Sequence, residues 1–165
     1  MLNIKKLIAL VLSVSLLLGI VANLLSGITE RNAKADVLAA MERVMPAENY
    51  EKSEMQFDAA TRILSLYEAK KGDELVGYCV ETEADGYENP IRVVVGVDAN
   101  GAVTKVEVLS IAETSGYNSK IKGEDFLSSF VGKNEELTVV NGKADTSAKI
   151  VAVSGATVSS NGVKE

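Results

Sequence analysis

The chain has 165 residues, enough for one domain of ordinary size, and its formal net charge is −6. A surface of that sign repels phosphate backbones, so nucleic acid is not an expected partner. The sequence contains no histidine and one cysteine, which excludes a His-ligated metal, a Ser-His-Asp triad, an intrachain disulfide and a cysteine-ligated iron-sulfur cluster. Electron or group transfer would therefore require an organic cofactor.

The N-terminal segment is typical of a membrane anchor. Residues 7–25, LIALVLSVSLLLGIVANLL, carry no charge, and a helix of that length spans about 28 Å of hydrocarbon. Lys5 and Lys6 precede the segment, so the positive-inside rule predicts a cytoplasmic N-terminus and an exported remainder. A cleaved signal peptide is the alternative, because residues 33–35, AKA, resemble a cleavage site, although the apolar segment is long for one. Either interpretation exports the rest of the chain.

A second helix is expected over residues 30–45. Apolar residues recur there at spacings of three and four, which places them in one stripe on a helix that Pro46 ends. We expect this juxtamembrane helix to continue from the membrane anchor through a short break at Gly27, and to space and dock the domain that follows.

The middle of the chain predicts an antiparallel meander. Four β-branched or alternating runs, separated by glycine-containing turns, occupy residues 62–69, 74–82, 91–98 and 102–110. The run 91–98 is the most apolar and is expected to be the central strand, while 102–110 should expose one face. Cys79 is expected to be a small packing residue of its strand.

The pattern changes after Ser110. A loop follows that contains an acidic residue, hydroxyls and Gly116, and a short helix is expected around residues 125–131, with Asp125 near its positive end. Residues 148–153 are expected to form a strand that leads directly into the final motif. The loop and the motif could therefore face one site.

The final motif, VSGATVSSNG at residues 153–162, crowds small side chains around Thr157. A strand followed by this turn and a helix start would aim backbone N–H groups at an anion lying over Thr157. A threonine hydroxyl without a histidine is not self-activating, so a partner enzyme would have to supply the activation. The alternative is that one of these hydroxyls only caps a terminal helix.

These features together resemble the covalent-FMN family. The resemblance rests on SGATVSSNGV at residues 154–163, on residues 86–121 and on the N-terminal anchor, and it covers nearly the whole chain in order. Members include the G subunit of the Rnf electron-transport complex and the C subunit of the sodium-pumping NADH:quinone oxidoreductase. The short length of this chain favours a resemblance to the Rnf G subunit.

The resemblance implies an α+β fold in three parts. These are a cytoplasmic tip and transmembrane anchor (1–28), a juxtamembrane helix and linker (29–56), and an extracytoplasmic FMN-binding domain (57–165) made of an antiparallel sheet with short helices. The family continues into a helix beyond Glu165, so we expect a sequence truncated at its C-terminus.

The resemblance also implies the site. FMN would be joined to Thr157 through a phosphoester, installed by a separate Mg-dependent flavin transferase that uses FAD. The family's Glu-Thr-Pro-Gly loop, which lies against the isoalloxazine ring, corresponds to residues 113–116, with Ser115 replacing Pro. Val151 stands where the family commonly has Asp. The implied cofactor-binding residues are Thr157, Ser154, Gly155, Ala156, Ser159, Glu113, Thr114 and Gly116, and no residue is predicted to be catalytic.

The implied function is that of an electron-transfer subunit of a membrane-bound, ion-translocating oxidoreductase complex, and not of an enzyme acting alone. Its partners would be the other subunits of an Rnf-type complex, the flavin transferase and membrane lipid, with the FMN domain on the outer face of the cytoplasmic membrane. Two alternatives stay open. One is an anchored domain that binds FMN or another anionic ligand non-covalently, and the other is a cofactor-free assembly subunit.

Overall fold

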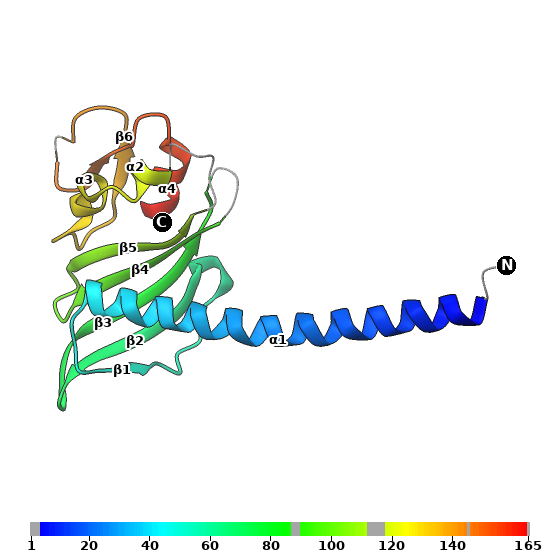
Figure 1. Cartoon of the computed structure of the whole chain (residues 1–165). Coiled ribbons are helices and arrows are strands. Elements are labelled where there is room, and N and C mark those ends of the chain that lie inside the picture. The colour runs from blue at the N-terminus through cyan, green and yellow to red at the C-terminus, as the bar shows by residue number, and fades with distance from the viewer. Residues whose placement is uncertain (1–3, 87–89, 112–117, 145, 165) are drawn as a thin grey trace. The chain divides into compact units, whose positions relative to one another are not determined.

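A computed structural model describes the backbone of residues 4–86, 90–111, 118–144 and 146–164, and the side chains of these residues except 4–9, 22–30, 59, 111, 118 and 119. The chain divides into two compact units, Met1–Asp36 and Val37–Glu165. One long helix comes first, then a meander of strands, and then a smaller lobe of short helices and strands (Figure 1).

Helix α1, Ile4–Val44, is continuous over 41 residues. The expected break at Gly27 is therefore wrong: one glycine costs a helix only about 1 kcal/mol, which good helix formers on both sides offset. The helix stops just before Met45 and Pro46, because proline disfavours helical geometry in the residue that precedes it. Among the residues described with side chains, no helix contains a segment both long and apolar enough to cross a membrane.

Five antiparallel strands form the main sheet, each paired with the next in sequence. The meander predicted for residues 62–110 is confirmed, and the sequence did not predict the short first strand. The strands are β1 (Asn49–Lys52), β2 (Ile63–Lys71), β3 (Glu74–Ala84), β4 (Ile91–Asp98) and β5 (Val103–Ile111).

The expectation that residues 91–98 form the central strand is wrong, because β3 occupies the middle and β4 lies second from the edge. The strong apolar character of β4 has another cause. Val93 and Val94 are adjacent, so they point to opposite faces of the sheet, and each is almost fully buried in a different core. Strand β5 buries Val106 and Val108 and exposes Lys105, as its alternating pattern predicted.

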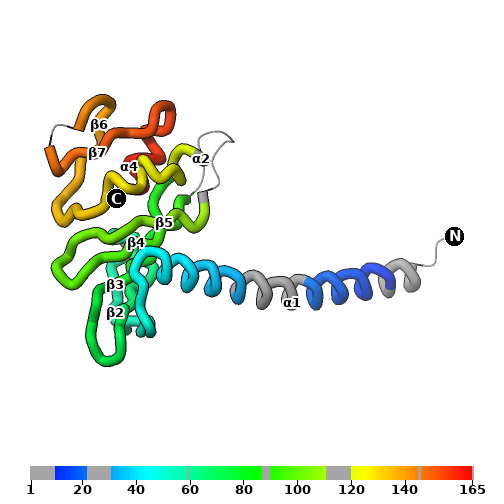
Figure 2. The backbone as a smooth tube through the Cα atoms, turned by 60° about the vertical axis from the view of Figure 1, so that its left-hand side comes forward, coloured from blue at the N-terminus to red at the C-terminus, as the bar shows by residue number. Residues whose placement is uncertain are grey.

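Each face of the sheet has its own core. On one face, the last turns of α1 pack against β2, β3 and β4 through a cluster that contains Met41, Val44, Cys79 and Val94. On the other face, β4 and β5 pack against the C-terminal lobe through a cluster that contains Ile91, Val93, Phe126 and Ile150. Figures 1 and 2 show the last turns of α1 against the sheet, while the lobe gathers beside β5.

The lobe contains short elements and a second sheet. Its elements are α2 (Asn118–Ile121), α3 (Glu124–Leu127), a 3₁₀ turn (Ser128–Phe130), β6 (Thr138–Val140), β7 (Lys149–Val151) and α4 (Thr157–Lys164). The helix expected around residues 125–131 corresponds to α3 with the 3₁₀ turn. The strand expected at 148–153 is the shorter β7, and it pairs in parallel with β6 in a separate two-stranded sheet.

Helix α4 is seated on the lobe side of the main sheet by a close backbone approach. A Cβ atom on Gly162 would meet the backbone carbonyl of Asp85, which directly follows β3, and would also touch Ile91. Gly162 and Val163 are buried there. The glycine is therefore required by contact distance, because any larger residue would push α4 away from the sheet.

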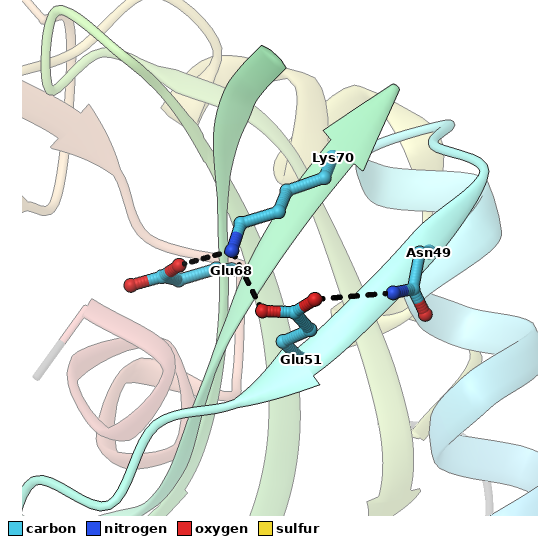
Figure 3. A network of polar contacts seen from close by, with 4 residues as sticks. All are labelled: Asn49, Glu51, Glu68 and Lys70. Carbon is cyan, nitrogen blue, oxygen red and sulfur yellow. Dashed lines mark hydrogen bonds and ion pairs between the residues drawn. The ribbon is translucent and has the colours of Figure 1, made fainter. Parts of the chain in front are cut away.

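Charged side chains lie along the edge of the sheet that β1 forms. On β1 and β2, Lys70 forms ion pairs with Glu51 at 2.6 Å and Glu68 at 3.0 Å, and Asn49 donates a hydrogen bond to Glu51 at 3.4 Å (Figure 3). The hydrogen bond to Glu51, which has the larger effect, and the hydrogen bond to Glu68 raise the pKa of Lys70. Exposed pairs of this kind add little stability, but charges on a short edge strand discourage pairing with another strand.

Cys79 should be unreactive in the folded chain. Burial raises the pKa of its thiol from 9.0 to about 11, so at pH 8 the folded state holds about 100-fold less thiolate than an unfolded chain. Labelling with a soluble disulfide reagent should be slower by at least that factor in buffer than in denaturant. Because the folded state binds this proton more tightly, the thiol's contribution to stability should be complete below pH 9 and decline between about pH 9 and 11. Equal labelling rates in both states would contradict the burial.

The close approach at α4 predicts that substitution by alanine destabilises the fold at one glycine, Gly162, and not at another, Gly142. Gly162→Ala should lower the free energy of unfolding by about 1–3 kcal/mol, because the added methyl group meets Asp85 backbone. Gly142→Ala is the matched control, since no atom lies within 4 Å of a Cβ added there, and it should change stability by less than about 0.5 kcal/mol. Urea denaturation of both variants measures the difference, and equal midpoints would contradict the packing.

Candidate functional site

A tight turn connects β7 to α4. The Ala156 N–H donates to the Val153 carbonyl at 2.9 Å, and Gly155 has φ = 81°, in the left-handed region that glycine adopts without strain. Ser154 and Gly155 are exposed, and Ala156 is buried in the lobe-side core. The turn therefore presents small residues to solvent immediately before the first residue of the helix, Thr157.

Ser160 holds this turn closed. Its side chain is fully buried, its hydroxyl donates to the Ala156 carbonyl at 2.8 Å, and it accepts a hydrogen bond from the Val153 N–H at 3.0 Å. The predicted site did not include Ser160, which the sequence presented only as one more hydroxyl at a helix start. Ser159, which the resemblance assigned to cofactor binding, is also buried, with 2% of its surface exposed.

The hydroxyl of Thr157 is exposed and has one close side-chain partner among the hydrogen bonds described. Thr157 Oγ1 donates to Asn141 Oδ1 at 3.3 Å, and Asn161 Nδ2 donates to the Thr157 backbone carbonyl at 3.0 Å. Asn141 directly follows β6, sixteen residues before Thr157, and no local pattern in the sequence marked it.

The start of α4 suits an anion. Within α4, whose residues the structure describes in full, the first turn holds no acidic side chain, and Lys164 lies in the last turn. The first N–H groups of a helix have no partners in the preceding turn, and the helix dipole makes this end partly positive. A phosphate attached to Thr157 would meet this end without a competing carboxylate from α4.

The phosphate-binding part of an FMN site fits the described residues. The acceptor hydroxyl is exposed, Ser154 and Gly155 leave the approach open, and two exposed apolar side chains, Val151 and Val158, lie close in sequence on either side. The other predicted residues, Glu113, Thr114 and Gly116, lie outside the described residues, as does Ser115. The part of the site expected to contact the flavin ring is therefore not among the features that the structure describes.

A hollow of about 580 Å³ runs along β7 toward the turn. It is lined by residues 149–153, by residues of α3 and of the 3₁₀ turn that follows it, including Phe126, and by Lys133. Lys133 Nζ donates a hydrogen bond to the backbone carbonyl of Ser147. This hollow ends at Val153, so the exposed hydroxyl of Thr157 is not part of its lining.

Comparisons with known proteins indicate the family of this chain. A profile described as the FMN-binding domain matches residues 86–165. The G subunit of the Na(+)-translocating ferredoxin:NAD(+) oxidoreductase complex of Acetobacterium woodii is 34% identical over 143 residues, which cover 82% of this chain and 69% of that protein.

Two further relatives carry similar names. The G subunit of the proton-translocating ferredoxin:NAD(+) oxidoreductase complex of Clostridium ljungdahlii is 36% identical over 104 residues, covering 60% of this chain and 56% of that protein. The G subunit of the ion-translocating oxidoreductase complex of Yersinia pestis is 32% identical over 130 residues, covering 72% of this chain and 62% of that protein. The chain thus spans between about half and two thirds of the length of these relatives.

A solved structure shares the fold. The crystal structure of Shewanella oneidensis NqrC aligns with a TM-score of 0.53 at 22% identity, covering 73% of this chain and 63% of that one. The matched FMN-binding domain and the extent of identity to the Acetobacterium protein lead to one conclusion: the chain belongs to the FMN-binding family of G subunits of ion-translocating oxidoreductase complexes.

Proposed function

We propose that this chain carries FMN in a phosphoester bond to Thr157 and acts as the electron-transfer G subunit of an Rnf-type, ion-translocating oxidoreductase complex. The observation that carries the proposal is the exposed Thr157 hydroxyl at the first residue of α4, behind a turn of small residues. This position lies within the region that the FMN-binding profile matches, and the relatives are named as G subunits of such complexes.

The described residues have distinct tasks in this proposal. The N-terminus of α4 stabilises the phosphate, Ser154 and Gly155 keep the approach open, and Ser160 fixes the turn that aims the hydroxyl outward. Ala156 and Ser159 support the site from the buried side. Glu113, Thr114 and Gly116 remain proposed ligands of the flavin ring. Bound FMN would supply one-electron transfer, and the chain has no histidine that could ligate a redox metal in its place.

The first 28 residues are proposed to anchor the domain in the cytoplasmic membrane, with the N-terminus inside and the FMN domain on the outer face. Residues 7–25 are uncharged, with Lys5 and Lys6 before them. Large apolar side chains described in this part of α1 are 43–68% exposed, and such surface is typical of contact with lipid or another protein. They are Leu10, Val11, Leu12, Val14, Leu16, Leu17, Leu18, Ile20 and Val21.

Assembly requires partners of three kinds in this proposal. A separate flavin transferase modifies Thr157, because the chain has no histidine to activate that hydroxyl. Membrane lipid surrounds the anchor. The other subunits of the complex deliver and remove electrons, so the chain is one component of the oxidoreductase and not an enzyme alone.

Thr157→Val should abolish covalent flavin while leaving the fold intact, because valine has nearly the same shape but no hydroxyl. The chain is co-expressed with a flavin transferase, denatured, and examined by intact mass and in-gel flavin fluorescence. The unsubstituted chain should gain the mass of one FMN less one water, and Thr157→Ser should retain some of that gain. Fluorescence that survives Thr157→Val on a denaturing gel would remove Thr157 from its role.

Non-covalent binding of FMN is the second candidate, favoured by Val151 at the position where the family commonly has Asp. The two candidates separate in one measurement, because only a covalent adduct persists through denaturation. Flavin that co-purifies with the native chain and is lost in denaturant would support the second candidate and contradict the first.

Val151→Asp should raise the initial rate of covalent flavin incorporation severalfold. Val151 is exposed at the end of β7, three residues before Ser154, where a transferase that contacts the turn could reach a carboxylate. Val131→Asp is the matched control, since Val131 is also an exposed valine but lies outside the turn, and it should leave the rate unchanged. An equal increase in both variants would indicate a general effect of charge and contradict a specific role for position 151.

A further inference from the structure

The parallel pairing of β6 and β7 places Asn141 beside Thr157. Parallel strands end at the same edge of a sheet, so the residues that follow β6 and those that follow β7 emerge together. Val139 pairs with Ile150 and Val140 with Val151, and the Ala152 N–H extends the pairing with a bond to the Val140 carbonyl at 2.9 Å. This registration brings Asn141 Oδ1 to 3.3 Å from Thr157 Oγ1.

The hydroxyl of Thr157 donates to a side chain from another strand. A threonine inside a helix commonly donates to the carbonyl four residues earlier, but Thr157 is the first residue of α4 and Val153 lies in the turn before it. The Val153 carbonyl accepts the Ala156 N–H at 2.9 Å in the turn. The hydroxyl instead donates to Asn141, a residue from another strand. In this contact Asn141 does not cap the helix, because its amide oxygen accepts from a side-chain hydroxyl and not from a backbone N–H of the first turn.

We infer that Asn141 is a positioning residue for flavin attachment: its amide oxygen holds the proton of the Thr157 hydroxyl and thereby directs an oxygen lone pair toward solvent, where the phosphorus arrives. This inference rests on the proposed covalent attachment to Thr157. The oxygen–oxygen distance of 3.3 Å is longer than the usual 2.7–2.8 Å, and such contacts commonly shorten when the reacting partner binds.

The step that Asn141 assists is balanced with a flavin adenine dinucleotide as donor. Thr157 Oγ1 forms a bond to the phosphorus on the riboflavin side, and the pyrophosphate bond of the donor breaks. AMP leaves with the electron pair of that bond. The hydroxyl proton leaves the contact with Asn141 late in the step, as the oxygen–phosphorus bond forms, and passes to a base of the transferase. Asn141 is not that base, because an amide does not take up a proton at neutral pH. Its contribution is orientation of the nucleophile.

The test compares two Asn→Leu substitutions in the full chain, since leucine resembles asparagine in shape but cannot accept a hydrogen bond. Asn141→Leu should lower the transferase kcat for this chain about fivefold, the usual contribution of one neutral hydrogen bond, and leave KM for the chain within about twofold. Asn134→Leu, a change at another exposed asparagine of the lobe, should alter neither. Intact mass at timed intervals follows the reaction, and thermal unfolding checks that both variants fold.

A second measurement tests the contact without any flavin. In NMR spectra of the unmodified full chain, Thr157→Val should shift the side-chain amide signals of Asn141 and leave those of Asn134 in place. Unshifted Asn141 signals would overturn the inference whatever the kinetics show.

The outcomes separate this inference from the proposed function. Loading of the unsubstituted chain and of Asn141→Leu at equal rates would overturn the role of Asn141 while leaving attachment to Thr157 intact. An unsubstituted chain that never gains mass would overturn both. A lower kcat that is accompanied by a large fall in melting temperature in Asn141→Leu alone would indicate a structural role and would also count against the inference.

Discussion

The geometry of the site depends on one buried hydroxyl. Ser160 joins the end of β7 to the start of α4 by accepting from Val153 and donating to Ala156, so strand and helix meet at a fixed angle. Without this hydroxyl the Val153 N–H would lose its partner in a partly buried place, at a cost of about 1–3 kcal/mol, whereas the Ala156 carbonyl would still accept the Ser160 N–H. The exposed part of the motif can therefore consist of small, weakly interacting residues, because the buried Ser160 hydroxyl determines the shape of the turn.

The scaffold below the site depends on β4, the strand with a core on both faces. Val94 contacts the cluster that includes the last turns of α1, and Val93 contacts the lobe that bears Thr157. Close-packed interiors transmit strain instead of absorbing it, so the two cores constrain each other through a single strand. Thr104 adds a polar link, since its hydroxyl donates to the carbonyl of Val44 at 2.7 Å and connects β5 to the end of α1.

Sequence reasoning found the long elements and two of the short ones, α3 and β7, and missed β1 and β6 for identifiable reasons. Strands β2 to β5 carry alternating or β-branched runs with glycine turns, so their pairing could be predicted. Strand β1, NYEK, is polar and only four residues long, and β6 has three residues, so neither has a recognisable period. The position of Thr157 followed from its motif, whereas Asn141 depends on a parallel register that no local pattern records. Strand β4 was expected to be central because it is the most apolar run. Its apolar character instead reflects the two cores, one on each of its faces.

Burial of the solitary cysteine bears on where such a domain can function. A single thiol at the surface of a protein in an oxidising compartment can join two copies through an intermolecular disulfide or be capped by small thiols. Cys79 is sealed between the sheet and the last turns of α1, with none of its surface accessible. The chain can therefore meet an oxidising environment without a paired cysteine and without covalent cross-linking between copies.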